Sequence, residues 1–281
     1  MKKIVGLLAP VLGSAVLLAC TSTTSSPVVA CGPDDVATTN WDVVVVTNYE
    51  AAWYYASLDA VPLGFYTVAS VPVADATLVV SADGAATAVA AAVGQYFPNG
   101  CATATASGNV TTFTLNNCTG PLGLVRSTGT VTATFTLASN AIQIQLAGNK
   151  ISANGATVNL ATTGTLTAAN GQKTLQANSA TTGTGPDGNG VAHSGTYTLV
   201  WPTGDGCATI NGTLSGIGTG AYAGTSTQIT NYVACAGKCP QSGTATSSFN
   251  GGTATLTFNG SSNAQCSASN GTSASVPLHC P

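Results

Sequence analysis

Charged side chains are scarce in this chain of 281 residues, in which Asp, Glu, Lys and Arg together make up only 5%. Seven of the nine acids lie between Asp34 and Asp83, so the rest of the chain must stay soluble through Thr, Ser, Asn and Gln. No run of Lys or Arg forms a basic patch, and we therefore expect no nucleic acid as a partner. With so little charge, long-range electrostatic steering is not expected to guide recognition.

Groups suited to catalysis are also few. The chain has two histidines, His193 and His279, and no Gly-x-Ser-x-Gly motif. Asp187, His193 and Ser194 lie close together in the sequence, but neighbouring residues on a strand point to opposite faces of a sheet, which argues against a catalytic triad. We therefore predict no catalytic residues and no enzymatic activity.

The sequence offers no convincing site for a metal or a cofactor. Residues 183–188 match the dinucleotide-binding pattern by letter, but Pro186 and the following Gly190 favour a loop over the helix that this pattern requires. A single carboxylate, Asp187, is too few for a calcium loop. Cys235 and Cys239 could be drawn as zinc ligands, yet cysteines of an exported chain are more often paired in disulfides. We predict neither a metal nor a cofactor.

The N-terminus has the three parts of a secretory signal over residues 1–19: two lysines, an apolar run from Ile4 to Leu18, and a small residue before the cleavage point. The apolar run is shorter than the roughly 20 residues that a membrane-spanning helix needs. Its last residues, Leu17-Leu18-Ala19-Cys20, resemble the lipobox of bacterial lipoproteins. The alternative is an ordinary signal peptide, exported through the same Sec route, with a cysteine near its cleavage point.

The resemblance to bacterial lipoproteins implies a modification and an address. In that family the signal is removed before the cysteine, the sulfur receives a diacylglyceryl group, and the new amino terminus is acylated, commonly with palmitate. Cys20 is then the lipidation site, and Thr21 in place of Asp favours the outer membrane. Two or three acyl chains make membrane attachment effectively permanent. Residues 20–30 are predicted to be the lipidated cysteine and a flexible Ser/Thr-rich tether.

Removal of residues 1–19 leaves four cations (Arg126, Lys150, Lys173 and Lys238) against nine acids, a formal net charge of −5. The remaining chain is long enough for one large β domain or two small ones. Eight cysteines remain besides Cys20, an even number that predicts up to four disulfides in an oxidising compartment. The pairs we predict are Cys101–Cys118, Cys207–Cys235, Cys239–Cys280 and Cys31–Cys266.

Residues 31–100 form a segment with helical patterns. Apolar residues recur at helical spacing from Asn48 to Ala60, and a second helix of small apolar residues is predicted from Ala85 to Tyr96, with Asp83 before it. This segment also concentrates aromatic residues. They are predicted mainly as core, but in exposed positions they could bind a ligand such as a sugar; the candidates are Trp41, Trp53, Tyr54 and Tyr55.

From residue 101 to residue 281 the pattern changes to period two, which is typical of antiparallel strands with one buried and one solvated face. At least ten such runs occur. They are Val110–Leu115, Thr130–Leu137, Ile142–Leu146, Ala156–Leu160, Thr163–Thr167, Thr196–Trp201, Ala208–Leu214, Thr225–Val233, Thr253–Phe258 and Ser273–Leu278. Asn-Gly pairs supply the hairpin turns. The predicted fold is mainly β, a large antiparallel meander or sandwich with two short N-terminal helices.

Five threonines at alternate positions from Thr128 to Thr136 resemble the Thr-x-Thr ladders of ice-binding proteins. Threonine is also simply a good strand former, and the irregular spacing elsewhere argues against a regular array.

These observations together predict a non-catalytic lipoprotein of the cell envelope with a structural or interaction role, anchored in the outer membrane and facing the periplasm or the cell surface. Its expected partners are the membrane, through the lipid anchor, and an envelope polysaccharide or protein. The alternative is a module that binds polysaccharide or lipid.

Overall fold

The computed structural model describes residues 81–280, except for 97, 120–125, 140, 154–155, 185–189, 203–206, 217–225, 236–237, 250–251 and 279. Several predicted features lie outside the described residues: the signal, the lipidation site Cys20, the tether, the aromatic group, and the helix from Asn48 to Ala60.

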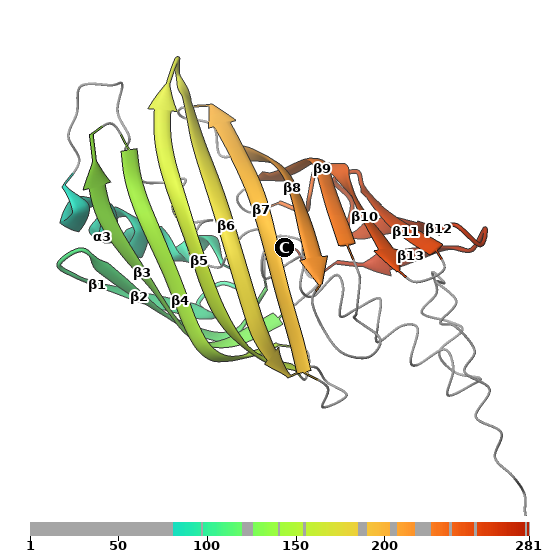
Figure 1. The fold of residues 1–281 in the computed structure, drawn as a ribbon, viewed down its shortest axis with the longest axis horizontal. Coiled ribbons are helices and arrows are strands. Elements are labelled where there is room, and N and C mark those ends of the chain that lie inside the picture. The colour runs from blue at the N-terminus through green and yellow to red at the C-terminus, as the bar shows by residue number, and fades with distance from the viewer. Residues whose placement is uncertain are drawn as a thin grey trace, which may run out of the picture.

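One sheet of 13 antiparallel strands makes up most of the described chain, and each strand pairs only with its neighbours in the sequence (Figure 1). The prediction of a mainly β antiparallel meander is confirmed. The strands are β1 (Ala102–Ser107), β2 (Val110–Thr119), β3 (Arg126–Ala138), β4 (Ala141–Ala153), β5 (Ala156–Ala169), β6 (Gln172–Thr184), β7 (Gly190–Pro202), β8 (Cys207–Gly216), β9 (Ser226–Cys235), β10 (Ser242–Phe249), β11 (Gly252–Phe258), β12 (Asn263–Ala268) and β13 (Ser273–Pro277).

The sequence pattern divides or misses strands in which polar residues face the core. The runs Ala156–Leu160 and Thr163–Thr167 are one strand, β5, because the buried residue between them is a threonine, Thr162. Four strands, β1, β6, β10 and β12, are absent from the predicted set. In β6 the core positions include Ser179 and Thr181, so its hydrophobic alternation is weak even though its burial pattern alternates.

The described residues contain one α-helix, α3 (Ala82–Ala91), which corresponds to the second of the two helices predicted for the N-terminal segment. It begins earlier than predicted because Ser81 is the N-cap and its hydroxyl accepts a hydrogen bond from the Gly84 N–H. Its end tightens into the 3-10 turn η2 (Ala92–Gln95). No helix within the described ranges is long and apolar enough to cross a bilayer.

The helix packs on one face of the sheet over β1, β2 and β3, with Ala85, Ala86 and Val89 buried. The Thr111 hydroxyl of β2, itself fully buried, donates to the Ala86 carbonyl oxygen at 2.7 Å. We call this face of the sheet the inner face and the opposite face the outer face. Inner side chains form one continuous core, whose largest fully buried members are Tyr232, Phe113, Phe135, Leu115, Ile144, Ile151, Leu166 and Leu175.

Three β-bulges interrupt the register of the sheet, in β2, β4 and β9. Each contains a non-glycine residue with positive φ: Asn117 (57°), Lys150 (54°) and Asn231 (48°). A side chain of the neighbouring strand accepts a hydrogen bond from the backbone N–H of each of them; the acceptors are Thr128 Oγ1, Asn159 Oδ1 and Asn211 Oδ1. These bonds compensate for the ladder bonds that a bulge loses, and the bulges bend the strands.

Candidate functional site: the uncharged outer face

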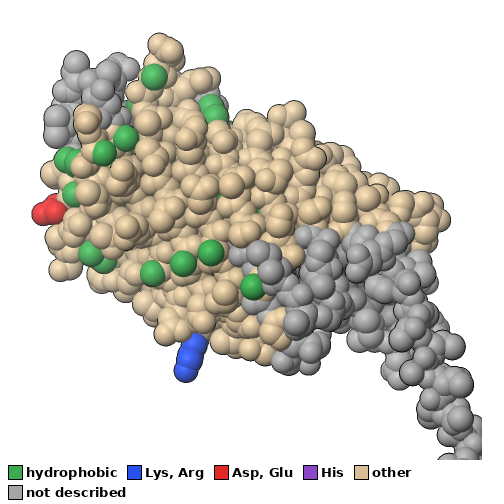
Figure 2. All heavy atoms as spheres, in the orientation of Figure 1, with side chains coloured by type: hydrophobic (Ala, Val, Ile, Leu, Met, Phe, Trp, Pro, Cys, Tyr) green, Lys and Arg blue, Asp and Glu red, His purple; other side chains and the backbone are tan. Residues whose placement is uncertain are grey.

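The outer face of the sheet carries almost no charge. Figure 2 shows a broad surface of uncharged side chains and backbone, with cationic and acidic atoms only at its border. The described part of the chain has five charged residues. Asp83 lies in α3, Lys173 is buried on the inner face, and Arg126 begins β3. Lys150, in β4, and Lys238, which precedes β10, are exposed. Recognition on this face must therefore use neutral hydrogen bonds.

The strand register places the polar outer side chains in rows that run across the sheet. The first row, which we call the Thr134 row, is continuous from β3 to β13 and contains only hydroxyl and carboxamide side chains. Its members are Thr134, Gln145, Thr163, Asn178, Thr196, Thr213, Gln228, Thr246, Thr255, Ser267 and Ser273.

A second row lies two residues further along each strand, and we call it the Thr136 row. It also contains only hydroxyl and carboxamide side chains, and it crosses the β9 bulge. Its members are Thr136, Gln143, Thr165, Gln176, Thr198, Asn211, Thr230, Thr244, Thr257, Gln265 and Ser275.

Strand geometry gives the two rows a regular spacing. Neighbouring side chains of a row are about 4.8 Å apart, and the rows are about 7 Å apart along each strand. Hydroxyl and carboxamide groups both donate and accept hydrogen bonds. Some members bond to each other within the Thr134 row, as Thr196 does to Thr213 at 3.2 Å between their Oγ1 atoms and Thr246 to Thr255 at 3.0 Å. The rows thus form a grid of neutral donors and acceptors.

The alternate threonines of β3, which resemble an ice-binding ladder in sequence, lie on this face, but the neighbouring strand changes their surroundings. Thr134 and Thr136 stand opposite Gln145 and Gln143 of β4. Glutamine side chains extend further from the sheet than threonine side chains, so the rows are uneven and differ from the flat rank of hydroxyls and methyls in an ice-binding ladder. The side chains of a row thus differ in height, whereas their spacing from strand to strand stays regular.

Apolar groups add little to this face. Leu137, 41% exposed, is the one large hydrophobic side chain that is exposed among those the structure describes. The aromatic candidates Trp41, Trp53, Tyr54 and Tyr55 lie outside the described residues, and so do the side chains of His193 and His279. Within the described ranges, no group of three or more His, Cys, Asp or Glu side chains is placed to hold a metal ion.

Three predicted disulfides are present: Cys101–Cys118, Cys207–Cys235 and Cys239–Cys280. Cys266 is also disulfide-bonded; Cys31, its predicted partner, lies outside the described residues. The first bond closes the β1–β2 hairpin, and the second joins β8 to β9 at directly opposite positions. Cys235 and Cys239, the potential zinc ligands, are therefore both oxidised, which argues against a zinc site there.

Some buried hydroxyls of the inner face lack a hydrogen-bond partner. Thr162 of β5 and Ser179 of β6 stand opposite each other, are 2% and 6% exposed, and have no partner for their side-chain oxygens. An unsatisfied buried hydroxyl destabilises the folded state by about 1–3 kcal/mol. The two residues thus form a polar spot in an otherwise apolar core.

We expect the substitution Thr162→Val to increase the free energy of unfolding, by about 1 kcal/mol, because it removes an unsatisfied hydroxyl at constant shape. Thr111→Val is the matched control: it removes a hydroxyl that bonds the Ala86 carbonyl of α3, and it should lower the free energy of unfolding by about 1–2 kcal/mol. Urea denaturation measures both changes. A loss of stability in both variants would show that the Thr162 hydroxyl does have a partner.

The buried ammonium group of Lys173 should make the free energy of unfolding depend on pH. It lies on the inner face of β6, 7% exposed, and desolvation lowers the pKa of its ammonium group below the ordinary 10.5. The unfolded chain therefore binds a proton more readily than the folded chain in the window between the two pKa values, so this residue makes stability rise as the pH increases towards 10.5. Urea denaturation across that window should show the rise in the native chain and a flatter profile in Lys173→Met. Equal profiles would contradict the prediction.

Comparison of the chain with protein-family models, with curated proteins and with solved structures finds no match. The function must therefore be inferred from the sequence signals and from the outer face.

Proposed function

We propose that the protein is a non-catalytic lipoprotein of the cell envelope, anchored in the outer membrane through Cys20, whose β domain has a structural or interaction role. The lipobox Leu17–Cys20 supports the anchor. The disulfides support an oxidising compartment, because such bonds persist outside the cytosol. The observation that carries the interaction role is the uncharged outer face, with its two continuous rows of hydroxyl and carboxamide side chains.

Mass spectrometry of the protein from its native membrane tests the anchor. We expect residues 1–19 to be absent and Cys20 to carry a diacylglyceryl group and an amide-linked acyl chain. The substitution Cys20→Ala should leave the protein out of the membrane fraction. An unmodified Cys20 in the native protein would overturn the proposed anchor.

A second candidate function, favoured by the Thr134 and Thr136 rows, is binding of a neutral polysaccharide. Sugar hydroxyls, like the side chains of the grid, donate and accept hydrogen bonds without charge. The repeated spacing of the rows offers equivalent contacts along an extended polymer, so weak individual bonds add through multivalency. An acidic polymer would find no cationic partner within the two rows, which contain no charged residue.

A glycan array of neutral and acidic polysaccharides tests this candidate. Binding to neutral members should fall at least about tenfold when Gln145, Asn178 and Gln228 of the Thr134 row are replaced together by alanine. The matched control replaces Asn116, Asn149 and Gln172, exposed amides outside both rows, and should bind like the native chain. Loss of binding in Trp53→Ala instead would assign the sugar site to the aromatic group of the N-terminal segment.

A further inference from the structure

Among the described residues, the meander has two edge strands, β1 and β13, and the backbone groups that point outward from them differ. An edge strand with free N–H and C=O groups can pair with a strand of another chain, and natural sheets usually block such edges with Pro, charge or bulges. The comparison of the two edges shows that one is blocked and the other is open.

On β13 the hydrogen bonds to β12 are made at the even-numbered residues. The Leu278 N–H donates to the Ser262 carbonyl, and the Ala268 N–H donates to the Thr272 carbonyl. Successive residues of a strand direct their N–H and C=O groups to opposite sides. The backbone groups of the odd-numbered residues, Ser273, Ser275 and Pro277, therefore point outward, away from β12. Pro277 has no N–H to donate, so it interrupts the outward row of this edge.

On β1 the alternation exposes a different set of residues. The Asn116 N–H donates to the Cys101 carbonyl, and Ser107 pairs with Val110 beside the hairpin turn. The odd-numbered residues of β1 therefore bond to β2, and the backbone groups of Ala102, Ala104 and Ala106 point outward. The β1 strand, Ala-Thr-Ala-Thr-Ala-Ser, has no Pro, no charge and no bulge in its pairing with β2.

We propose that β1 pairs antiparallel with β1 of a second copy of this chain, so that one sheet continues through a twofold symmetric dimer. The partner is a second copy because the outward residues are self-complementary. With the twofold axis at Ala104, Ala104 faces Ala104 of the other copy, and Ala102 faces Ala106. Each of these pairs exchanges two backbone hydrogen bonds, and any shift of register forms fewer of them.

Side chains on both faces fit this arrangement. Thr103 and Thr105, both exposed on the outer face, become cross-strand neighbours of Thr105 and Thr103 of the other copy. Cross-strand threonine pairs are favourable, and β1 introduces no like charges at the junction. The uncharged outer face then runs without interruption from one copy to the next, and both α3 helices lie on the inner face.

Sedimentation equilibrium of the full chain in a density-matched detergent tests the dimer. We expect the native chain to sediment as a monomer–dimer equilibrium, and the double variant Thr103→Lys/Thr105→Lys to raise the dissociation constant at least about tenfold, because it gathers four like charges at the junction. The matched control, Thr112→Lys/Thr114→Lys, places the same charges one strand further in, on the same face, and should dimerise like the native chain.

Hydrogen exchange on the unmodified chain gives a second, independent measurement. The amides of Ala102, Ala104 and Ala106 should exchange more slowly at high protein concentration than at low concentration, whereas β13 should not change. A chain that remains monomeric at every concentration, a Thr103→Lys/Thr105→Lys variant that folds and dimerises like the native chain, or concentration-dependent protection at β13 alone would each overturn the proposal.

Discussion

The substitution Gly243→Ala should lower the free energy of unfolding by about 3–5 kcal/mol, one of the two largest effects expected in this protein. Gly243 of β10 stands opposite the bulge of β9, and its φ of +105° is rarely adopted by other residues. A Cβ atom at this position would meet the backbone of the neighbouring strand β9, at Tyr232 Cα and the Asn231 carbonyl oxygen. Backbone atoms cannot move away as a flexible side chain can, so β9 and β10 must separate.

The damage should extend into the core, because Tyr232 is fully buried and its ring packs edge-to-face on Phe258 at 5.0 Å between centroids. Gly171→Ala is the matched control. Gly171 also has positive φ (+69°), in the β5–β6 turn, but no atom lies within 4 Å of the added Cβ. It should cost only about 1 kcal/mol of backbone strain. Equal midpoints for the two variants in urea denaturation would show that the contact with β9 is not the cause.

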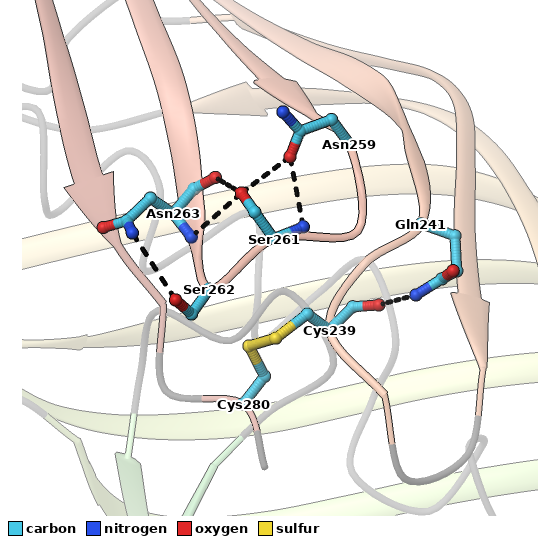
Figure 3. Close-up of a disulfide and its surroundings, with 7 residues drawn as sticks. All are labelled: Cys239, Gln241, Asn259, Ser261, Ser262, Asn263 and Cys280. Carbon is cyan, nitrogen blue, oxygen red and sulfur yellow. Dashed lines mark hydrogen bonds between the residues drawn. A yellow bond between two sulfur atoms is a disulfide. The ribbon is translucent and has the colours of Figure 1, made fainter.

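Removal of the Cys239–Cys280 disulfide by Cys239→Ser/Cys280→Ser should cost about 4 kcal/mol in the free energy of unfolding. This bond spans 41 residues, the longest loop among the disulfides in the described part of the chain, and it should therefore restrict the unfolded chain most. In the folded chain it ties the segment after β13 to the segment before β10 (Figure 3). The last four strands are thereby closed into one unit.

The surroundings of this disulfide form a second layer of restraint. The Gly260 N–H, in the β11–β12 turn, donates to the Pro240 carbonyl, and the Gln241 amide donates to the Cys239 carbonyl. Within the turn, Asn259 Oδ1 accepts hydrogen bonds from the N–H and hydroxyl groups of Ser261 (Figure 3). None of these bonds reaches β13; without the disulfide, its end would be held by the pairing with β12 and by the hydrogen bond from the Leu278 N–H to the Ser262 carbonyl.

The matched control for this prediction is Cys101→Ser/Cys118→Ser, which opens a loop of 17 residues and should cost about 3 kcal/mol. Hydrogen exchange should show faster opening of β13 in the first variant and of β1 in the second. If the two losses of stability were in the reverse order, native packing around the sulfur atoms would outweigh the loop entropy.

Much of the fold could be predicted from the sequence, because the turns and the period-two pattern are local signals. Asn170-Gly171 illustrates this: both residues have positive φ, as a two-residue type I′ hairpin turn requires. The start of α3 is harder to predict from the sequence, because its N-cap, Ser81, is one of many serines in this chain. Cys101–Cys118 and Cys207–Cys235 could be matched because an antiparallel hairpin brings positions symmetric about its turn together. Cys239–Cys280, which spans four strands, could be paired only from the cysteines that remained.

The candidate site could not be predicted, because a row across strands depends on register. Gln145, Thr163 and Asn178 are distant in the sequence, and only the pairing of β4, β5 and β6 aligns them. A bulge of one residue, such as that at Lys150, changes which side chains face outward, and its position is set by tertiary packing. The protection of the sheet edges, unlike the rows, can be predicted from the sequence once the edge strands are known, because β13 contains Pro277 and β1 is uncharged.

The strictly sequential pairing of the strands also has a consequence for how the domain forms and how it can evolve. Every strand pairing links segments that are adjacent along the polypeptide, so ordering can spread from any hairpin to the next without first closing a long loop. For the same reason, duplication or deletion of a hairpin in the middle of the meander would lengthen or shorten the sheet without changing the path of the remaining chain.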